Sequence, residues 1–320
     1  MKWVLGIGLG LMLLKFITYG LTRSNAVLTD ALESIINVLA GGFTLWSLHY
    51  ASQPRDRNHP YGHGKIEYFA SGLEGGMIGI AGFFMVYKSV YSIFYPPQLK
   101  ALDYGIALTL LTGLINYFMA RRLIRIGTAL SSSGMVADGT HLLTDTWSSL
   151  ALVAGLFLIH LTGWVLLDSL LTAGLGVLII WTGFKLIREA WFNLMDKTDP
   201  MQMERLLEAI NRARIPEWID LHHCRIQKHG AVLHLDAHVT LPWYIDLKEV
   251  HRHTADLQQR ISQHYTQEIE CNIHADPCIP HSCKICSVSN CSYRLHAMEQ
   301  QVNWTVDNIW PDTKHRIYER

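Results

Sequence analysis

The chain has 320 residues, and its 27 lysines and arginines balance 27 aspartates and glutamates, so the formal net charge is zero. A neutral chain gives no bulk electrostatic case for binding nucleic acid. Hydrophobic residues make up 49% of the chain and charged residues only 17%, which is apolar for a soluble protein. Only five of the 17 histidines precede residue 200, and all six cysteines lie at or after Cys224. An apolar half is therefore followed by a polar half rich in His and Cys.

Six apolar runs predict six transmembrane helices, because each approaches the roughly 20 residues needed to cross a bilayer. They cover residues 3–21, 26–48, 68–94, 102–124, 132–161 and 165–187. The first run resembles a signal peptide, but no small-residue cleavage site follows it cleanly, so we expect an uncleaved first helix. The sequence thus predicts a transmembrane domain over residues 1–195, embedded in the lipid bilayer.

Lysine and arginine concentrate in alternate loops of this domain. One side holds Lys2, three cationic residues within 55–65, Arg121, Arg122, Arg125, Lys185 and Arg188, whereas the other holds Arg23 and Lys100. The positive-inside rule then places both the N- and the C-terminus in the cytoplasm. Because no targeting segment precedes the first span, we expect a bacterial inner (cytoplasmic) membrane rather than an organellar one.

Two of the spans carry polar side chains at helical spacing. The fifth contains Asp138, His141 and Asp145, and the second contains Glu33 and Asn37, preceded by an aspartate one turn earlier. Residues three or four apart share one helix face, and an ionisable residue inside a span faces the bundle interior by default. These faces predict either helix–helix hydrogen bonds or one four-ligand metal site.

The proposed ligands of that site are Glu33, Asn37, His141 and Asp145. Four-coordinate geometry with His and carboxylate ligands suits Zn²⁺, and the oxygen donors are also acceptable to Fe²⁺ or Mn²⁺.

The loop between the second and third spans holds Asp56, His59 and His63. Their spacing permits all three to bind one metal ion. Surface histidines are also often merely solvated, so both interpretations remain at this point.

The character of the chain changes after Asp196. An amphipathic segment is followed by two alternating segments around a Lys-His-Gly turn, then by helical spacing and a third alternating segment. This α-β-β-α-β order predicts a small two-layer α+β domain over residues 196–277.

Residues 278–320 form a Cys-rich tail for which we expect a final helix over about 293–306. Cys278, Cys283, Cys286 and Cys291 have spacings of four, two and four intervening residues. In a reducing cytoplasm such a cluster favours metal over disulfides. Four cysteines with one Cys-x-x-Cys pair suit structural Zn²⁺, and an iron–sulfur cluster is the second candidate.

Four motifs together resemble the cation diffusion facilitator family of proton-coupled divalent-metal exporters. They are LTDALESIIN in the second span, NHPYGHGKIEYFAS after it, VADGTHLLTDTWSSL in the fifth span and IHADP at the end of the α+β domain. The resemblance covers residues from about 5 to 277. It implies a homodimer shaped like an inverted V, with a ferredoxin-like cytoplasmic domain, that alternates between inward- and outward-facing states.

The resemblance also implies site residues. The family's transport site falls on Glu33, Asn37, His141 and Asp145, although members commonly carry Asp-Asp or His-Asp on the second helix. A loop metal site is implied at Asp56, His59 and His63. A cytoplasmic metal site at the dimer interface is implied at His238, His251, His274 and Asp276, with His234 and His253 as alternatives.

We therefore predict a secondary active transporter, a cation/proton antiporter, rather than an enzyme. Its substrates would be Zn²⁺ first, with Fe²⁺ or Mn²⁺ also acceptable, exchanged for protons. A membrane metalloenzyme is a rival, but an intramembrane protease would need a nucleophile or an HExxH pair, and neither is present. The other rival is a membrane-tethered metal or redox sensor that uses the His- and Cys-rich C-terminal half.

Overall fold

The computed structural model describes residues 2–129, 133–230, 232–265 and 267–317, apart from the side chains of residues 2–4, 127, 133–138, 140 and 141. The chain divides into two compact units. One comprises Met1–His49 and Glu67–Trp191, and the other comprises Tyr50–Ile66 and Phe192–Arg320.

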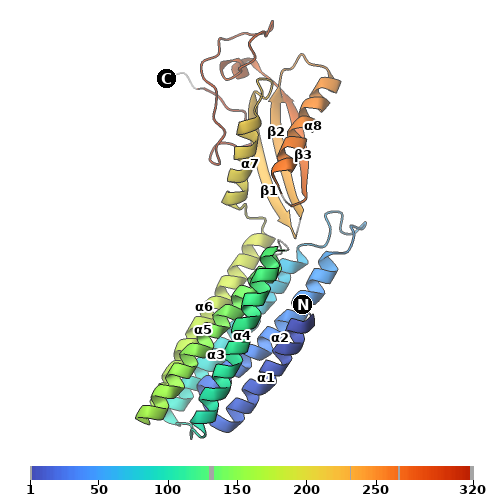
Figure 1. The fold of residues 1–320 in the computed structure, drawn as a ribbon. Helices are drawn as coiled ribbons and strands as arrows, with labels where there is room; N and C mark the ends of the chain where they lie inside the picture. The colour runs from blue at the N-terminus through green and yellow to red at the C-terminus, as the bar shows by residue number, and fades with distance from the viewer. Residues whose placement is uncertain (1, 130–132, 231, 266, 318–320) are drawn as a thin grey trace. The chain divides into compact units, whose positions relative to one another are not determined.

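Six long helices make up the first unit, where they run side by side (Figure 1). They are α1 (Lys2–Thr22), α2 (Asn25–Ala51), α3 (Ile66–Phe94), α4 (Leu102–Ala129), α5 (Ser133–Thr162) and α6 (Leu166–Leu194). All six are long and apolar enough to cross a membrane. Large hydrophobic side chains such as Phe83 and Trp181 are exposed on them, as expected where lipid replaces water. The predicted six spans are confirmed.

The start of α2 is held by a buried carboxylate on α6. Asp168 accepts hydrogen bonds from the backbone N–H of Asn25 at 2.9 Å and of Ala26 at 3.4 Å, and from the hydroxyl of Ser24. The first N–H groups of a helix have no partner within the helix, and a negative charge there also suits the helix dipole. Asp168 therefore anchors the N-terminus of α2, the helix that carries Glu33 and Asn37.

Glycines allow α3 and α6 to approach closely. A Cβ atom at Gly75 would lie 2.8 Å from the carbonyl oxygen of Gly183, and one at Gly82 would lie 2.9 Å from that of Gly176. Small residues at such spacing are the usual means of close packing between transmembrane helices. Gly76, by contrast, has no heavy atom of the described residues within 4 Å of its Cβ position.

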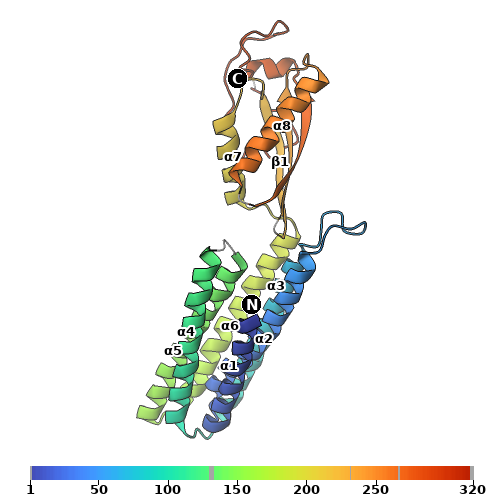
Figure 2. The ribbon, with the colours of Figure 1, turned by 45° about the vertical axis from the view of Figure 1, so that its right-hand side comes forward.

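The second unit contains the predicted α-β-β-α-β order. Its elements are α7 (Pro200–Ala213), β1 (Asp220–His229), β2 (Val232–Leu241), α8 (Leu247–His264) and β3 (Ile269–Pro277), followed by a short 3₁₀ helix, η1 (Pro280–Lys284). Asp199 and Asp246 cap the two helices by accepting the backbone N–H of Met201 and Glu249. Helices α7 and α8 lie side by side against the sheet (Figure 2).

The sheet has the order β1-β2-β3, with β1 antiparallel and β3 parallel to β2. Its register pairs His222 on β1 with His238 on β2, and His238 with His274 on β3. The pairing of β1 with β2 shifts between His222 and Arg225, as at a β-bulge. Three histidines thus lie across three adjacent strands.

The tail packs into the same core as the sheet. Trp304 and Ile309 are fully buried among side chains of α7, α8 and the strands. The expected helix over 293–306 is wrong, because this segment consists of turns and irregular backbone. The N–H groups of Glu299 and Gln300 donate to the carbonyl of Lys284, so contacts with an earlier segment replace helical hydrogen bonds.

Candidate metal-binding sites

The intramembrane residues Asn37 and Asp145 come together from two different spans. The Asn37 side-chain amide donates to Asp145 Oδ2 at 2.8 Å, and Asp145 is only 4% exposed. The other end of the amide, Asn37 Oδ1, is buried and has no hydrogen-bond partner among the described residues. A buried oxygen without a donor is costly unless something else binds it. It is therefore free to act as a neutral ligand.

Glu33 lies within electrostatic range of Asp145, Asp30 and Lys15. It nevertheless lines a different cavity, between α2, α5 and α6, together with Asp30. Asn37 and Asp145 line a cavity of ≈ 100 Å³ with Lys15. The structure thus places Glu33 and Asp145 in the linings of two different cavities.

His141 lies one helical turn before Asp145 on α5, as the spacing requires. Its side chain, like that of Asp138, lies outside the described part of the structure.

A buried ion pair adjoins these residues. Lys15 Nζ lies 2.7 Å from Asp30 Oδ1, with the side chains 4% and 7% exposed. The burial of Asp30 against Lys15 favours a structural role for this aspartate. The signal available in the sequence was that Lys15 is the one charged residue inside the first apolar run.

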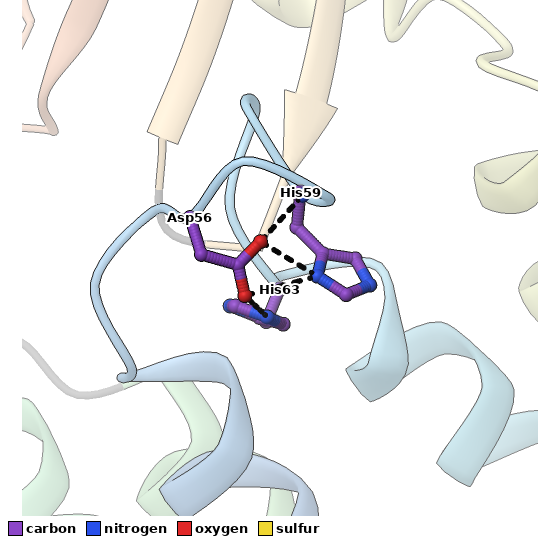
Figure 3. A group of neighbouring side chains, drawn as sticks. All are labelled: Asp56, His59 and His63. Atoms are coloured by element: carbon purple, nitrogen blue, oxygen red, sulfur yellow. Dashed lines mark hydrogen bonds and ion pairs between the residues drawn. The ribbon is translucent and has the colours of Figure 1, made fainter.

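The loop residues Asp56, His59 and His63 also converge (Figure 3). His59 Nδ1 lies 3.1 Å from Asp56 Oδ1, and His63 Nε2 lies 3.6 Å from Asp56 Oδ2. One ligand atom from each residue lies within 4.8 Å of the others, which fits a single metal ion.

Local hydrogen bonds hold the Asp56 carboxylate in place and favour its ionised form. Its carboxylate accepts the backbone N–H of His59 at 2.7 Å and of Asn58 at 2.8 Å. The His59 hydrogen bond holds the pKa of Asp56 below its usual value. His63 is buried, and its Nδ1 has no partner among the described residues. These donors fit a divalent ion that tolerates nitrogen and oxygen ligands.

The loop is tied to the α+β domain of the same unit. Arg55 forms an ion pair with Glu270 at 2.5 Å, and Lys65 forms one with Asp196 at 2.9 Å. The Tyr61 ring contacts His229 and His234 edge-on, with ring centroids 5.6 and 5.5 Å away. These two histidines were not assigned to the loop by sequence analysis, because their proximity to it depends on the tertiary fold.

A third cluster lies across the sheet. His222 Nε2 and His238 Nδ1 lie 3.1 and 3.3 Å from Asp276 Oδ2, and His274 Nε2 lies 3.6 Å from Asp276 Oδ1. Burial lowers the pKa of His222, which favours the neutral ring that a metal requires. His222, His238 and Asp276 meet the same 4.8 Å condition as the loop group.

This cluster contains three of the four predicted residues. His238, His274 and Asp276 lie together, whereas His251 is exposed on α8 and does not belong to the group. His222 takes the remaining place because the strand register sets it opposite His238.

Two residues of the tail, Asp312 and His315, pair with residues of β1, and sequence analysis predicted neither contact. His223 Nδ1 lies 2.9 Å from Asp312, and His315 Nδ1 lies 2.6 Å from Asp220. Burial opposes ionisation of Asp220, but the hydrogen bonds from His315 outweigh it and lower the pKa of Asp220. No local pattern linked positions 312 and 315 to β1, since the connection arises from the return of the tail.

The four tail cysteines, Cys278, Cys283, Cys286 and Cys291, are all free thiols. They lie in one region after β3, around η1.

Comparisons with known proteins agree with this arrangement. A family model described as the cation efflux transmembrane domain matches residues 2–195, and one described as the cation efflux protein cytoplasmic domain matches residues 198–278. An uncharacterized transporter of Synechocystis sp. is 34% identical to this chain over 82% of the chain and 84% of that protein. Cation-efflux pumps named FieF from Salmonella arizonae and Salmonella newport are each 23% identical over 84% of the chain, covering 89% and 88% of those proteins. The chain therefore belongs to the cation diffusion facilitator family and is an integral membrane cation-efflux transporter.

Proposed function

We propose that this protein exports a divalent transition-metal cation by alternating access, in exchange for protons. The observation that carries the proposal is the buried contact between Asn37 on α2 and Asp145 on α5, which leaves the Asn37 amide oxygen buried and without a hydrogen-bond partner among the described side chains. Unpaired polar groups at that depth are expensive and mark a pathway by default.

The proposed ligands are Glu33, Asn37, His141 and Asp145. One imidazole nitrogen and three oxygens in a four-coordinate site suit Zn²⁺, and the oxygen-rich set also accepts Fe²⁺ or Mn²⁺. The neutral Asn37 removes one charge compared with a pair of carboxylates, so metal preference depends on this position.

Proton coupling follows from the chemistry of these ligands. A carboxylate and an imidazole must lose their protons to bind a metal, and charges in apolar surroundings tend to be neutralised by protons when the metal leaves. An inward proton gradient would thus favour release of the metal on the outer side.

The α+β domain and the loop would support transport from the cytoplasm. We assign a loop metal site to Asp56, His59 and His63, and a second site to His222, His238 and Asp276, with His274 beside it. The protein would act as a homodimer formed through the cytoplasmic domain. Both termini would lie on the cytoplasmic side of a bacterial inner membrane, which fits the distribution of lysine and arginine among the loops.

The test is metal flux into proteoliposomes under an imposed pH gradient, with Zn²⁺, Fe²⁺ and Mn²⁺ compared separately. Asp145→Asn keeps the shape of the side chain and removes its charge. It should lower flux at least about tenfold, because even the loss of a group that only supports a metal ligand costs about that much. Asp103→Asn is the matched control, because the Asp103 side chain is 80% exposed at the start of α4.

Gradient-driven flux in the wild type and the control, lost in Asp145→Asn, would support both the exporter and its site. Equal flux in all three would remove Asp145 from the site. No flux for any metal, with metal still bound by the purified protein, would favour the sensor instead.

A further inference from the structure

The tail beyond residue 278 lies outside both regions matched by the family models, and it carries a group of cysteines that the transport mechanism does not use. Cys278 directly follows β3, and its N–H donates to the carbonyl of Leu241 at 2.8 Å, which continues the pairing of β3 with β2. Cys283 lies within η1, and Cys286 follows that turn. The first of these sulfur-bearing residues is therefore fixed to the sheet.

The Cys-x-x-Cys pair forms a tight turn. The N–H of Cys286 donates to the carbonyl of Cys283 at 3.3 Å, and the N–H of Ile285 donates to the carbonyl of Ser282 at 3.2 Å. Such a turn sets two thiols on the same side of the backbone, as in structural zinc sites with this spacing. Cys286 is 7% exposed and packs with Ile219 and Ile285, with Cys278 against the same cluster.

Aromatic contacts tie the segment that bears Cys291 to the end of β2. The centroid of the Tyr293 ring, two residues after Cys291, lies 4.8 Å from that of Trp243 and 5.0 Å from that of Tyr244. Cys291 thus lies near the turn that follows Leu241, to which Cys278 is hydrogen-bonded, although the two cysteines are 13 residues apart in the chain.

Arg294 holds the loop that bears these thiols. Its guanidinium donates to the carbonyls of Cys283 and Cys286, each at 3.1 Å, and of Val288 at 2.5 Å, and lies 3.9 Å from Cys286 Sγ. Four thiolates around a divalent ion carry a net charge of minus two. A fixed guanidinium beside one sulfur reduces that charge and makes the set of thiolates more stable.

We propose that Cys278, Cys283, Cys286 and Cys291 form a structural Zn²⁺ site that fastens the tail to the cytoplasmic domain. This site is independent of the proposed transport function. Thiolate ligands in a reducing compartment favour Zn²⁺, and four of them complete a closed tetrahedral site without an open position for substrate. No three of the four sulfurs in the described chain lie within 4.8 Å of one another, so the ion contracts the loop as it binds.

The contraction has a structural consequence. The residues after Cys291 return to the domain core through Trp304 and supply His315, which hydrogen-bonds Asp220 on β1. Zinc at the four cysteines would shorten the unconstrained length of chain between the sheet and this returning segment. It would thereby stabilise the surroundings of the His222–His238–Asp276 cluster without contributing a ligand to it.

The experiment uses full-length protein in detergent, loaded with Co²⁺ in place of Zn²⁺. A tetrahedral sulfur site gives thiolate-to-cobalt charge-transfer absorption, which sites made of His and Asp do not give. We expect this absorption, at one equivalent per chain, in the wild type. The double variant Cys283→Ser/Cys286→Ser should lose it, and Cys271→Ser, a half-buried cysteine on β3, should retain it.

A second measurement covers the case in which the double variant does not fold. Wild-type protein is alkylated with iodoacetamide with and without Zn²⁺, and the modified cysteines are identified by mass spectrometry. Zinc should protect the four tail thiols together and leave the labelling of Cys271 unchanged. Absence of the sulfur–cobalt band in the wild type, or labelling that zinc does not alter, would overturn the proposal. Bound iron with inorganic sulfide in anaerobically purified protein would overturn zinc in favour of an iron–sulfur cluster.

Zinc flux into proteoliposomes under a pH gradient tests the transport function separately from this proposal. The double variant should keep its flux, because no tail cysteine belongs to the transport site. Failure of the transport proposal would leave the cobalt spectrum unchanged.

Discussion

At the scale of single residues, Asn37 changes the electrostatics of the proposed transport site. Its amide nitrogen lies 2.8 Å from Asp145, where a carboxylate would place two negative charges in contact. Two carboxylates at that distance cannot both remain ionised, so one would hold a proton. An amide instead donates a hydrogen bond to Asp145, and its oxygen has no partner among the described residues. The residue pair thus stays intact with or without the ion.

The pair of Lys15 and Asp30 predicts a stability effect. Lys15→Met should lower the free energy of unfolding by about 3–5 kcal/mol, because it leaves a buried carboxylate without its partner. The double variant Lys15→Met/Asp30→Leu should recover most of this loss, since it removes both charges. Thermal unfolding in detergent measures the effect.

Lys185→Met is the control for that prediction, because Lys185 is 69% exposed and 3.9 Å from Glu189. It should change stability by less than about 1 kcal/mol. Additive losses in the double variant would mean that Lys15 and Asp30 act separately.

At the scale of helices, the approach of α3 to α6 depends on which glycine is altered. Gly75→Val should destabilise the bundle by about 1–3 kcal/mol, because its side chain would meet the backbone of Gly183. Gly76→Val should be tolerated, since its Cβ position is open. Unfolding midpoints of the two variants in detergent provide the comparison. Equal loss in both would show that helix propensity, and not packing, sets the requirement for glycine.

The elements of the fold could be predicted to different extents. Hydrophobic length is enough to locate the six spans, and alternation around a turn is enough to locate β1 and β2. The register between strands cannot be read from either signal, so sequence analysis did not place His222 beside His238 and His274. His251, which was predicted in the same group, lies on the exposed face of α8, and helical spacing alone does not show which face of that helix lies against the sheet.

The transport-site prediction has a similar limit. Spacing of three and four residues placed Asn37 and Asp145 on the inward faces of α2 and α5, and the structure joins them. Lys15 remained an unexplained charge, because its partner is 15 residues away on another helix. Pairings between helices depend on packing, which a single helical period does not specify.

At the scale of the whole molecule, the tail belongs to the folded cytoplasmic domain. Arg214 lies over the Trp304 ring at 3.7 Å, and the N–H groups of His223 and Cys224 donate to the carbonyls of Pro311 and Ile309. The segment therefore pairs with the edge of the sheet although it has no regular secondary structure. The helical pattern over 293–306 was overridden by these long-range contacts.

Trp304→Ala tests this arrangement. It should lower the free energy of unfolding of the cytoplasmic domain by about 3–5 kcal/mol, because Trp304 is 2% exposed and its removal leaves a cavity. Trp310→Ala, at a side chain that is 64% exposed, should have little effect. Chemical denaturation of the full chain, followed by tryptophan fluorescence, distinguishes the two. Similar losses in both variants would place the tail outside the core.

The buried pair of Lys15 and Asp30 also bears on the response to membrane voltage. In the proposed site a divalent cation balances Glu33 and Asp145, while Lys15 cancels Asp30 and Asn37 is neutral. With His141 uncharged, these six side chains and the bound cation therefore carry no net charge in total. Moving one uncompensated elementary charge across a membrane potential of 100 mV changes the free energy by about 2.3 kcal/mol, whereas moving a group of charges that sum to zero does not. Reorientation of the loaded transporter would then proceed at the same rate in polarised and depolarised membranes.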